Sequence, residues 1–430
     1  MTLLRFTPFQ KLLRKWESVC PQNGVQAMLV DGALDPDVVE LAWQSTLRDL
    51  GLGRIHVEED EGYTHEIWSG DPPAPLVSQL AGEIWVNGYL QEQVNRPFSP
   101  APAMPYRPFA LQQGGECYVG IAYQRWVADS VSVRLIMREW FLRIFFPAKA
   151  RRKLIDLPRL RTITGPEIGL SPRHVARAIR PCYRWLRDRK KFAGTHGFDS
   201  GVATLHSFEL PAHELDDLLL LARAEGCTLN DLLIAALAIA LAPQLGSDNN
   251  AGKRVAIATS IDLRPYEVGN VSETFGALLA YAPVICPLNM SNKLDLAQEV
   301  GRQTRRLKDP DQIAQILLLP RLLTRWASRR EPHDLVAFCR SYMPIAATIA
   351  NVNLNTSWLA LYHPAPVRAY LRVSAPNPAM PFAITTSTLG ESFHVTVSAC
   401  NSTTVDDPAQ TLGVAFATAL RSLVQSRPPQ

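Results

Sequence analysis

Four side chains that could take part in chemistry lie close together in the first third of the chain. They are Arg125, Asp129, Ser130 and Ser132, within the stretch Gln124-Arg125-Trp126-Val127-Ala128-Asp129-Ser130-Val131-Ser132. A carboxylate accepts hydrogen bonds, whereas a guanidinium stays protonated at any physiological pH. Arg125 could therefore stabilise negative charge, but it cannot act as a general base.

A strand and a helix must position this stretch. Residues 117–123 are β-prone and follow the turn residues Gly114-Gly115, which predicts a strand. Apolar residues then recur at helical spacing, namely Val133, Ile136, Met137, Trp140, Phe141 and Ile144. The pattern predicts a helix as far as Phe146, where Pro147 stops it. Asp129 falls near the helix start, where a carboxylate can cap free amides and suits the helix dipole.

The stretch resembles the His-His-x-x-x-Asp-Gly signature of the chloramphenicol-acetyltransferase-like superfamily. That superfamily includes the condensation domains of nonribosomal peptide synthetases and stand-alone acyltransferases. Asp129 and the trailing Ser132 keep their places, while Gln124, Arg125 and Ser130 replace the two histidines and the glycine. In the family the second histidine is the general base, so the resemblance implies an active site that lacks its usual proton acceptor.

Two later segments resemble the same family. Residues 226–231, Gly-Cys-Thr-Leu-Asn-Asp, are similar to its Gly-x-Thr-x-Asn-Asp segment, and an alanine-rich helix follows them. Asp262-Leu263-Arg264-Pro265, with Gly269-Asn270 soon after, resembles its Asp-Leu-Arg-Pro segment. In the family that arginine pairs with the motif aspartate. The resemblance therefore implies a buried ion pair between Asp129 and Arg264.

A third similarity lies on a late strand. Thr348-Ile349-Ala350-Asn351-Val352-Asn353 resembles the family's Ser/Thr-Asn-x-Gly strand end, with Asn353 in place of the glycine. If the protein catalyses acyl transfer, Arg125 and Asn351 could stabilise the developing oxyanion. The proton acceptor would then be the substrate amine itself, or a histidine such as His394 or His363.

The order of elements favours a mixed α/β (α+β) fold. Strands are predicted at 25–30, 54–58, 255–260, 345–351, 367–373, 382–387 and 393–400, and helices at 35–50, 171–192, 292–340 and 407–424. The resemblance implies two chloramphenicol-acetyltransferase-like lobes in a V, with a central channel lined by Arg125. We expect domains at 1–193 and 202–430, joined by a linker at 194–201.

Composition narrows the class of protein. The 430 residues are 47% hydrophobic and 20% charged, with a net charge of +4. No apolar run is long enough for a membrane span, and the N-terminus lacks the pattern of a signal peptide. Seven cysteines stand singly, without a CxxC pair, and indicate reduced packing residues rather than a metal site. We expect a cytoplasmic protein without a bound metal.

Arginines gather in two regions. Residues 149–191 hold ten arginines, and residues 292–340 hold a second group beside the apolar run 313–319. Both could be solvated faces. They could also dock an acidic carrier protein, the phosphates of a cofactor or, as a peripheral contact, an anionic membrane. Nucleic acid is not expected, because no recognition module appears and the overall charge is only slightly positive.

Two functions therefore stay open. One is transfer of an acyl group from a thioester, carried on phosphopantetheine or coenzyme A, to an amine or hydroxyl acceptor without the usual histidine. The other is a catalytically inactive condensation-like domain that recruits or scaffolds partner proteins of a biosynthetic pathway. Neither requires a tightly bound cofactor, and the sequence does not indicate the oligomeric state.

Overall fold

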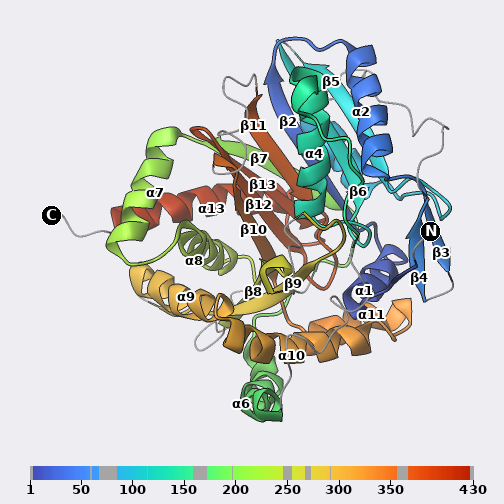
Figure 1. Cartoon of the computed structure of the whole chain (residues 1–430). Coiled ribbons are helices and arrows are strands. Elements are labelled where there is room, and N and C mark those ends of the chain that lie inside the picture. Colours follow the sequence, from blue (N-terminus) through green and yellow to red (C-terminus); the bar gives the residue numbers. More distant parts are fainter. Residues whose placement is uncertain are drawn as a thin grey trace. The chain divides into compact units, whose positions relative to one another are not determined.

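The computed structural model describes residues 3–58, 61–66, 85–113, 115–157, 172–195, 197–245, 254–266, 273–290, 292–355 and 367–426 (Figure 1). It divides into two compact units. Unit 1 comprises 1–168, 262–279 and 362–374, and unit 2 comprises 169–261, 280–361 and 375–430. The fold is mixed α/β, as predicted.

Unit 1 is built on a four-stranded antiparallel sheet in the order β11-β2-β6-β5. Its strands are β11 (Val367–Ser374), β2 (Asn23–Asp31), β6 (Glu116–Gln124) and β5 (Tyr106–Gln113). The helices α2 (Pro36–Leu50) and α4 (Ser130–Phe145) lie side by side on this sheet, and α3 (Val86–Asn95) also packs on it (Figure 1). Asp35 caps α2, and Gly51, with φ 72°, ends it in the left-handed conformation that suits glycine.

A smaller sheet and one helix complete unit 1. The sheet runs β1-β4-β3, with β1 (Leu4–Arg5), β4 (Gly62–His65) and β3 (Ile55–Glu58). Helix α1 (Pro8–Glu17) begins with a capping box in which Thr7 and Gln10 bond each other's backbone amides. A 3-10 turn, η1 (Pro147–Lys149), follows α4.

Unit 2 is built on a six-stranded sheet in the order β7-β13-β12-β10-β8-β9. Its strands are β7 (Ala203–Leu210), β13 (Ser392–Cys400), β12 (Phe382–Leu389), β10 (Ala347–Asn353), β8 (Arg254–Asp262) and β9 (Leu279–Pro287). Strand β10 runs parallel to β12 and β8, whereas β13 is antiparallel to β12 and β7.

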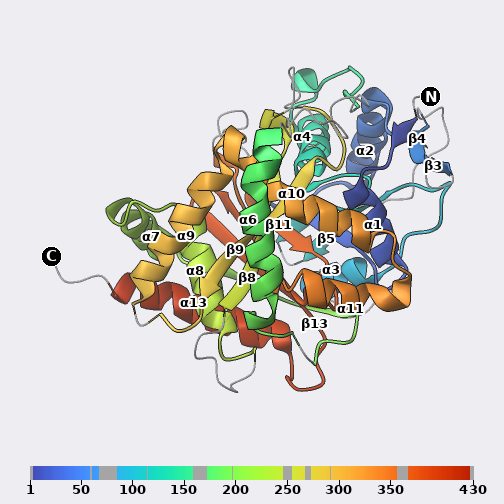
Figure 2. The same ribbon diagram turned by 90° about the horizontal axis from the view of Figure 1, so that it is seen from below.

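Helix α13 (Pro408–Gln425) packs directly on β13 and β7, α7 (Ala212–Ala224) also contacts β13, and α8 (Leu229–Leu241) packs on α13 and α7. Thr228 and Asp231 form the capping box of α8, the alanine-rich helix expected after residues 226–231. Unit 2 also contains α9 (Lys293–Leu307), α10 (Pro310–Ala327), α11 (Pro332–Tyr342) and α6 (Pro172–Asp188), and the 3-10 turn η2 (Arg189–Lys191) follows α6. A further 3-10 turn, η3 (Arg264–Tyr266), belongs to unit 1. Figure 2 shows α6 crossing α10, on which it packs.

Two segments of the chain make the units discontinuous in sequence. Strand β11 lies late in the sequence but pairs with β2 of unit 1, and residues 262–279 leave the sheet of unit 2 to join unit 1. The expected linker at 194–201 falls inside unit 2, where Ala193 N donates to the carbonyl of Arg254. The sequence suggested a single boundary between two continuous domains. It could not indicate the exchanged segments, because pairing between distant strands leaves little local signal in the sequence.

Most predicted elements agree with the structure within a few residues. Helix α6 continues through Pro181, which lies on an exposed position of the helix. The predicted helical segment 292–340 consists of three helices. Among the described residues no single helix is long and apolar enough to cross a membrane, and the pair α7 and α8 reaches the required length only across a bend of 104°.

Candidate functional site

The motif loop, residues 124–129, joins β6 to α4 as predicted. The carbonyl of Gln124 accepts hydrogen bonds from the amides of Val127 and Ala128, at 3.1 and 3.3 Å, which folds the loop back on the strand end. Asp129 is the N-cap of α4, and its Oδ1 accepts a hydrogen bond of 2.8 Å from the Ser132 amide. A carboxylate at this place satisfies an otherwise unpaired helical amide.

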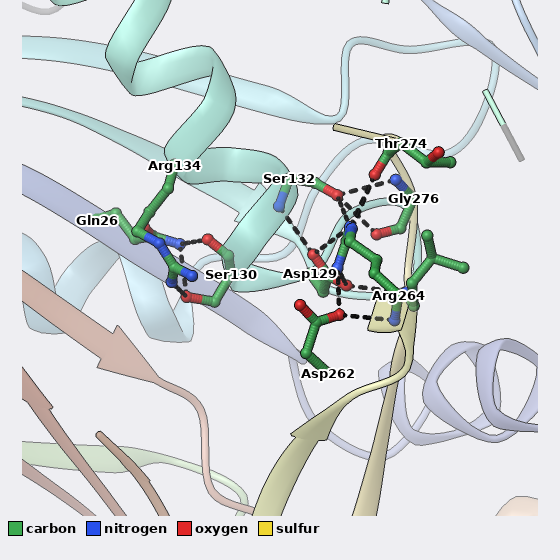
Figure 3. A network of polar contacts seen from close by, with 10 residues as sticks. Gln26, Asp129, Ser130, Ser132, Arg134, Asp262, Arg264, Thr274 and Gly276 are labelled. Carbon is green, nitrogen blue, oxygen red and sulfur yellow. Dashed lines mark hydrogen bonds and ion pairs between the residues drawn. The ribbon is translucent and has the colours of Figure 1, made fainter. Parts of the chain in front are cut away.

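Asp129 and Arg264 form the buried ion pair that the resemblance implied. Arg264 Nη1 lies 2.9 Å from Asp129 Oδ2, and Arg264 Nη2 lies 3.1 Å from Oδ1, so the contact is bidentate (Figure 3). The two side chains are only 2% and 1% exposed. Burial alone would lower the pKa of Arg264, but the Asp129 and Asp262 carboxylates outweigh it and raise that pKa.

Each side of this pair is further satisfied. The amide of Leu278 donates to Asp129 Oδ2 at 2.8 Å, and Arg264 donates to the Thr274 carbonyl through Nε and Nη2 at 3.0 and 2.9 Å. Ser132 Oγ accepts from Arg264 Nη2 at 2.8 Å and from the Gly276 amide at 2.9 Å, and it donates to the Gly276 carbonyl at 2.8 Å. We call Asp129, Ser132, Arg264, Thr274 and Gly276 the Asp129–Arg264 cluster (Figure 3).

The Asp129–Arg264 cluster joins the segment 262–279 to the start of α4 through hydrogen bonds and an ion pair. The stability of the fold is enough to explain the presence of both Asp129 and Arg264, because either charge buried here without the other would be costly. The sequence identified Asp129, Ser132 and Arg264 but missed Thr274 and Gly276, which contribute backbone groups. The Gly269-Asn270 segment lies outside the described residues.

A second group of residues surrounds Trp126, which belongs to the same loop. The Trp126 carbonyl accepts a 2.8 Å hydrogen bond from Gln10 Nε2, and its ring meets Phe6 and Tyr63 edge-on. Trp126 Nε1 donates to Glu17 Oε2 at 3.1 Å. We call Phe6, Glu17, Tyr63, His65 and Trp126 the Trp126 cluster.

Three members of the Trp126 cluster have strongly shifted pKa values, and burial raises that of Tyr63 from 10.0 to about 12. Burial raises the pKa of Glu17 from 4.5 to about 7, although the Trp126 hydrogen bond and Arg14 oppose the shift. Burial lowers the pKa of His65 from 6.5 to about 4, and in the described part of the chain neither ring nitrogen of His65 has a hydrogen-bond partner. Sequence reasoning missed all three residues, because they lie far from the motif in the chain.

Arg125 lies at the position that corresponds to the family's second histidine. Its amide donates to the Gln22 carbonyl at 3.3 Å, and the residue is half-buried between the buried Gln124 and Trp126. Burial raises the pKa of the neighbouring Tyr123, while the positive charges of Arg125 and Arg372 oppose that shift. Two arginines therefore act electrostatically on the end of β6.

A third arginine contacts the loop from α4. Arg134 Nη1 donates to Ser130 Oγ at 2.9 Å, and Gln26 Nε2 donates to the Ser130 carbonyl at 3.2 Å (Figure 3). The Tyr370 hydroxyl donates in turn to Gln26 Oε1 at 2.5 Å. Burial lowers the pKa of Arg134. The surroundings of Ser130 are thus polar and cationic, and neither Gln26 nor Arg134 was identified from sequence.

Three further predicted residues, Asn351, Asn353 and His394, lie in unit 2. Asn351 Oδ1 accepts a 2.8 Å hydrogen bond from the Thr386 hydroxyl, on the sheet face that also holds Val395. His394 pairs in register with Ser387, the residue after Thr386 in β12. Because neighbouring residues of a strand point to opposite faces, His394 lies on the other face of the sheet, where its Nε2 is 3.6 Å from Glu209 Oε2. The structure therefore does not bring Asn351 and His394 together. Asn353 is exposed, its Oδ1 accepts from the Asn355 amide at 2.9 Å, and His363 lies outside the described residues.

No protein-family model matches the chain, and no curated protein sequence matches it. Solved structures do match over almost its whole length. The first condensation domain of the calcium-dependent antibiotic synthetase is 16% identical, with 98% of this chain and 96% of that chain covered and a TM-score of 0.65. The epimerization domain from the third module of tyrocidine synthetase B is 13% identical, with coverages of 99% and 96% and a TM-score of 0.64.

The condensation domain of the Monacolin K polyketide synthase gives 13% identity, coverages of 99% and 98%, and a TM-score of 0.63. The chain therefore has a fold similar to that of condensation domains. The similarity extends over both units, and the Asp129–Arg264 pair occupies the two positions that the motifs assigned to it.

Proposed function

We propose that the protein transfers an acyl group from a thioester, carried on phosphopantetheine or coenzyme A, to an amine acceptor. The observation that supports this most is the replacement of the motif's base by Arg125 while the scaffold around it stays intact. A guanidinium suits stabilisation of the negative charge that develops on the carbonyl oxygen when a nucleophile attacks a thioester. Arg125 would thus act as an electrophile and not as a base.

The absence of a base at residue 125 favours an amine over a hydroxyl acceptor. A neutral amine attacks without first losing a proton, and the C–N bond forms as the carbonyl oxygen becomes an oxyanion. When the C–S bond breaks, the electron pair leaves with sulfur, and the proton released from nitrogen neutralises the thiolate. A hydroxyl is a much weaker nucleophile until a base removes its proton.

Cationic side chains around the loop support the same step. Arg125 and Arg372 act on Tyr123, and Arg134 donates to Ser130, so positive charge is concentrated beside the motif. Preorganised cations stabilise an oxyanion without reorganising during the reaction. Asn351 was predicted to share this role; it belongs to the other unit, and its contribution stays a prediction.

Recruitment of partner proteins is the second candidate. It is favoured by the completeness of the Asp129–Arg264 cluster, whose internal hydrogen bonds explain the retained motif residues without catalysis. A recruiting domain would bind a carrier-borne chain and leave its mass unchanged.

Intact-mass analysis separates the two candidates. Acylated carrier protein and acyl-coenzyme A are each incubated with an amine and with the wild type, Arg125→Ala, Arg125→Lys or the surface control Arg302→Ala. We expect the wild type and the control to deacylate the donor and form the amide, Arg125→Ala to be slower by roughly a hundredfold or more, and Arg125→Lys to retain part of the rate. Carrier binding without any turnover would support recruitment, and neither binding nor turnover would contradict both candidates.

A further inference from the structure

Helix α6 has two distinct faces. Its inner face is anchored on unit 2: Ala178 is fully buried, Trp185 Nε1 donates to the Tyr342 carbonyl at 2.9 Å, and the Trp185 ring lies 5.0 Å from that of Phe192. Its outer face is exposed and bears arginines at three- and four-residue spacing, namely Arg177, Arg180, Arg184 and Arg187. Beside them Ile179 and Tyr183 are 63% and 64% exposed.

Helix α10, on which α6 packs, continues this composition. Leu322 and Trp326, one turn apart, are 44% and 51% exposed. Arg325, Arg329 and Arg330 lie beside them and are exposed too. We call the exposed residues of the two helices the arginine–aromatic face; its members are Arg177, Ile179, Arg180, Tyr183 and Arg184 of α6, and Leu322, Arg325, Trp326 and Arg329 of α10 and the turn after it.

The charge of this face is of one sign. Residues 172–187 and 312–330 contain no aspartate, glutamate or lysine. Histidine aside, their basic residues are all arginines. Among the described residues, Arg177, Arg180, Arg184, Arg325 and Arg329 form no ion pair. Some exposed arginines of unit 2 have acidic partners, as in Arg187–Asp188 at the end of α6, Arg302–Glu299 and Arg421–Glu214.

We propose that the arginine–aromatic face docks the protein on an anionic membrane surface. Arginine matches lipid phosphates with paired hydrogen bonds, tyrosine and tryptophan favour the headgroup level, and the aliphatic side chains of Ile179 and Leu322 can enter the acyl boundary. An acidic protein would bring some basic groups as well, and the face offers them no carboxylate. A bilayer of anionic lipids presents negative charge throughout. The inference does not depend on acyl transfer.

Vesicle co-sedimentation of the full chain tests this proposal. The vesicles are phosphatidylcholine alone, or phosphatidylcholine with an equal amount of phosphatidylglycerol. We expect binding only to the mixed vesicles, with a steep loss on adding salt, because exposed charges are screened within about 8 Å at physiological ionic strength. The triple variant Arg177→Ala, Arg180→Ala, Arg184→Ala should bind on the order of 100-fold more weakly.

A matched variant controls for net charge. Arg223→Ala, Arg302→Ala, Arg421→Ala removes the same number of exposed arginines from α7, α9 and α13 and should change vesicle binding by less than about threefold. Tyr183→Ala with Trp326→Ala should abolish the binding that survives added salt, because that part is apolar. Absence of binding to anionic vesicles, or equal loss in the two triple variants, would overturn the proposal. Binding of an acidic carrier protein that the α6 triple variant loses, without vesicle binding, would assign the face to a protein partner and also overturn it.

Discussion

The Asp129–Arg264 cluster and the Trp126 cluster both include residues of the same loop, but their buried polar groups are satisfied to different extents. In the first, a buried carboxylate and a buried guanidinium satisfy each other and the surrounding backbone. In the second, hydrogen bonds and charges do not fully offset the cost of burying Glu17 and His65. The pKa of Glu17 is therefore raised and that of His65 lowered, so that the neutral form of each is favoured. The comparison shows that a paired charge stabilises a scaffold, whereas an uncompensated one makes stability depend on pH.

Breaking the first cluster should have the largest effect. Arg264→Met leaves the Asp129 carboxylate buried without its counter-ion, and we expect the free energy of unfolding to fall by about 3 to 5 kcal/mol. Urea denaturation measures it. Arg421→Met, which breaks an exposed pair with Glu214, should cost less than about 1 kcal/mol. The double variant Asp129→Asn, Arg264→Met should cost less than the sum of its single changes; simple additivity would show that the pair is not coupled.

His65 should make the protein sensitive to acid. Its folded pKa of about 4 lies below its ordinary 6.5, so the folded state resists protonation and stability falls as the pH drops from about 6.5 to 4. The difference of about 2.5 in pKa corresponds to about 3 kcal/mol. His65→Phe keeps a ring against Tyr63 and Phe275 and should remove this loss in melting curves recorded across that range. An unchanged acid dependence in the variant would mean that His65 is not buried in this way.

Glu17 should act with the opposite sign, through a pKa shift of similar size. Its raised pKa means that the folded state holds the proton more tightly, so stability falls as the pH rises from about 4.5 to 7 and is constant above. Glu17→Gln keeps an acceptor for Trp126 Nε1 and should stabilise the protein by about 1 to 3 kcal/mol at pH 8, with little change at pH 4. Equal stabilisation at both pH values would point to packing and not to the charge.

Arg125→Ala should have the smallest effect on stability, within about 0.5 kcal/mol, because its half-buried side chain belongs to neither cluster. A loss comparable to that of Arg264→Met would make Arg125 part of the scaffold. Thermal melting of the two variants side by side decides this.

The sequence was most informative where structure is local. The cap at Asp129, the capping box at Thr228 and Asp231, and the strands 117–123 and 393–400 all follow from short patterns, and the structure contains each of them. The Asp129–Arg264 pair could be predicted only because two separate motifs resembled one family.

Features formed by distant segments could not be predicted in this way. The pairing of β11 with β2, the backbone groups of Thr274 and Gly276, and the shifted acidity of Glu17 depend on which segments meet in the folded chain. The opposite orientation of Asn351 and His394 depends on strand register, which the alternating pattern of a single strand does not fix between strands.

In the proposed mechanism, residue 125 acts through its positive charge, within a scaffold that the Asp129–Arg264 cluster maintains. The most direct test is the amide-forming rate of the double variant Gln124→His, Arg125→His in the intact-mass assay, compared with the wild type. A general base contributes about 10² to 10⁴-fold only where positioning and oxyanion stabilisation already exist. We expect the double variant to be slower than the wild type. Robust transfer to amines or alcohols by the double variant, from an inactive wild type, would show an ordinary acyltransferase site lacking only its base and would contradict the claim.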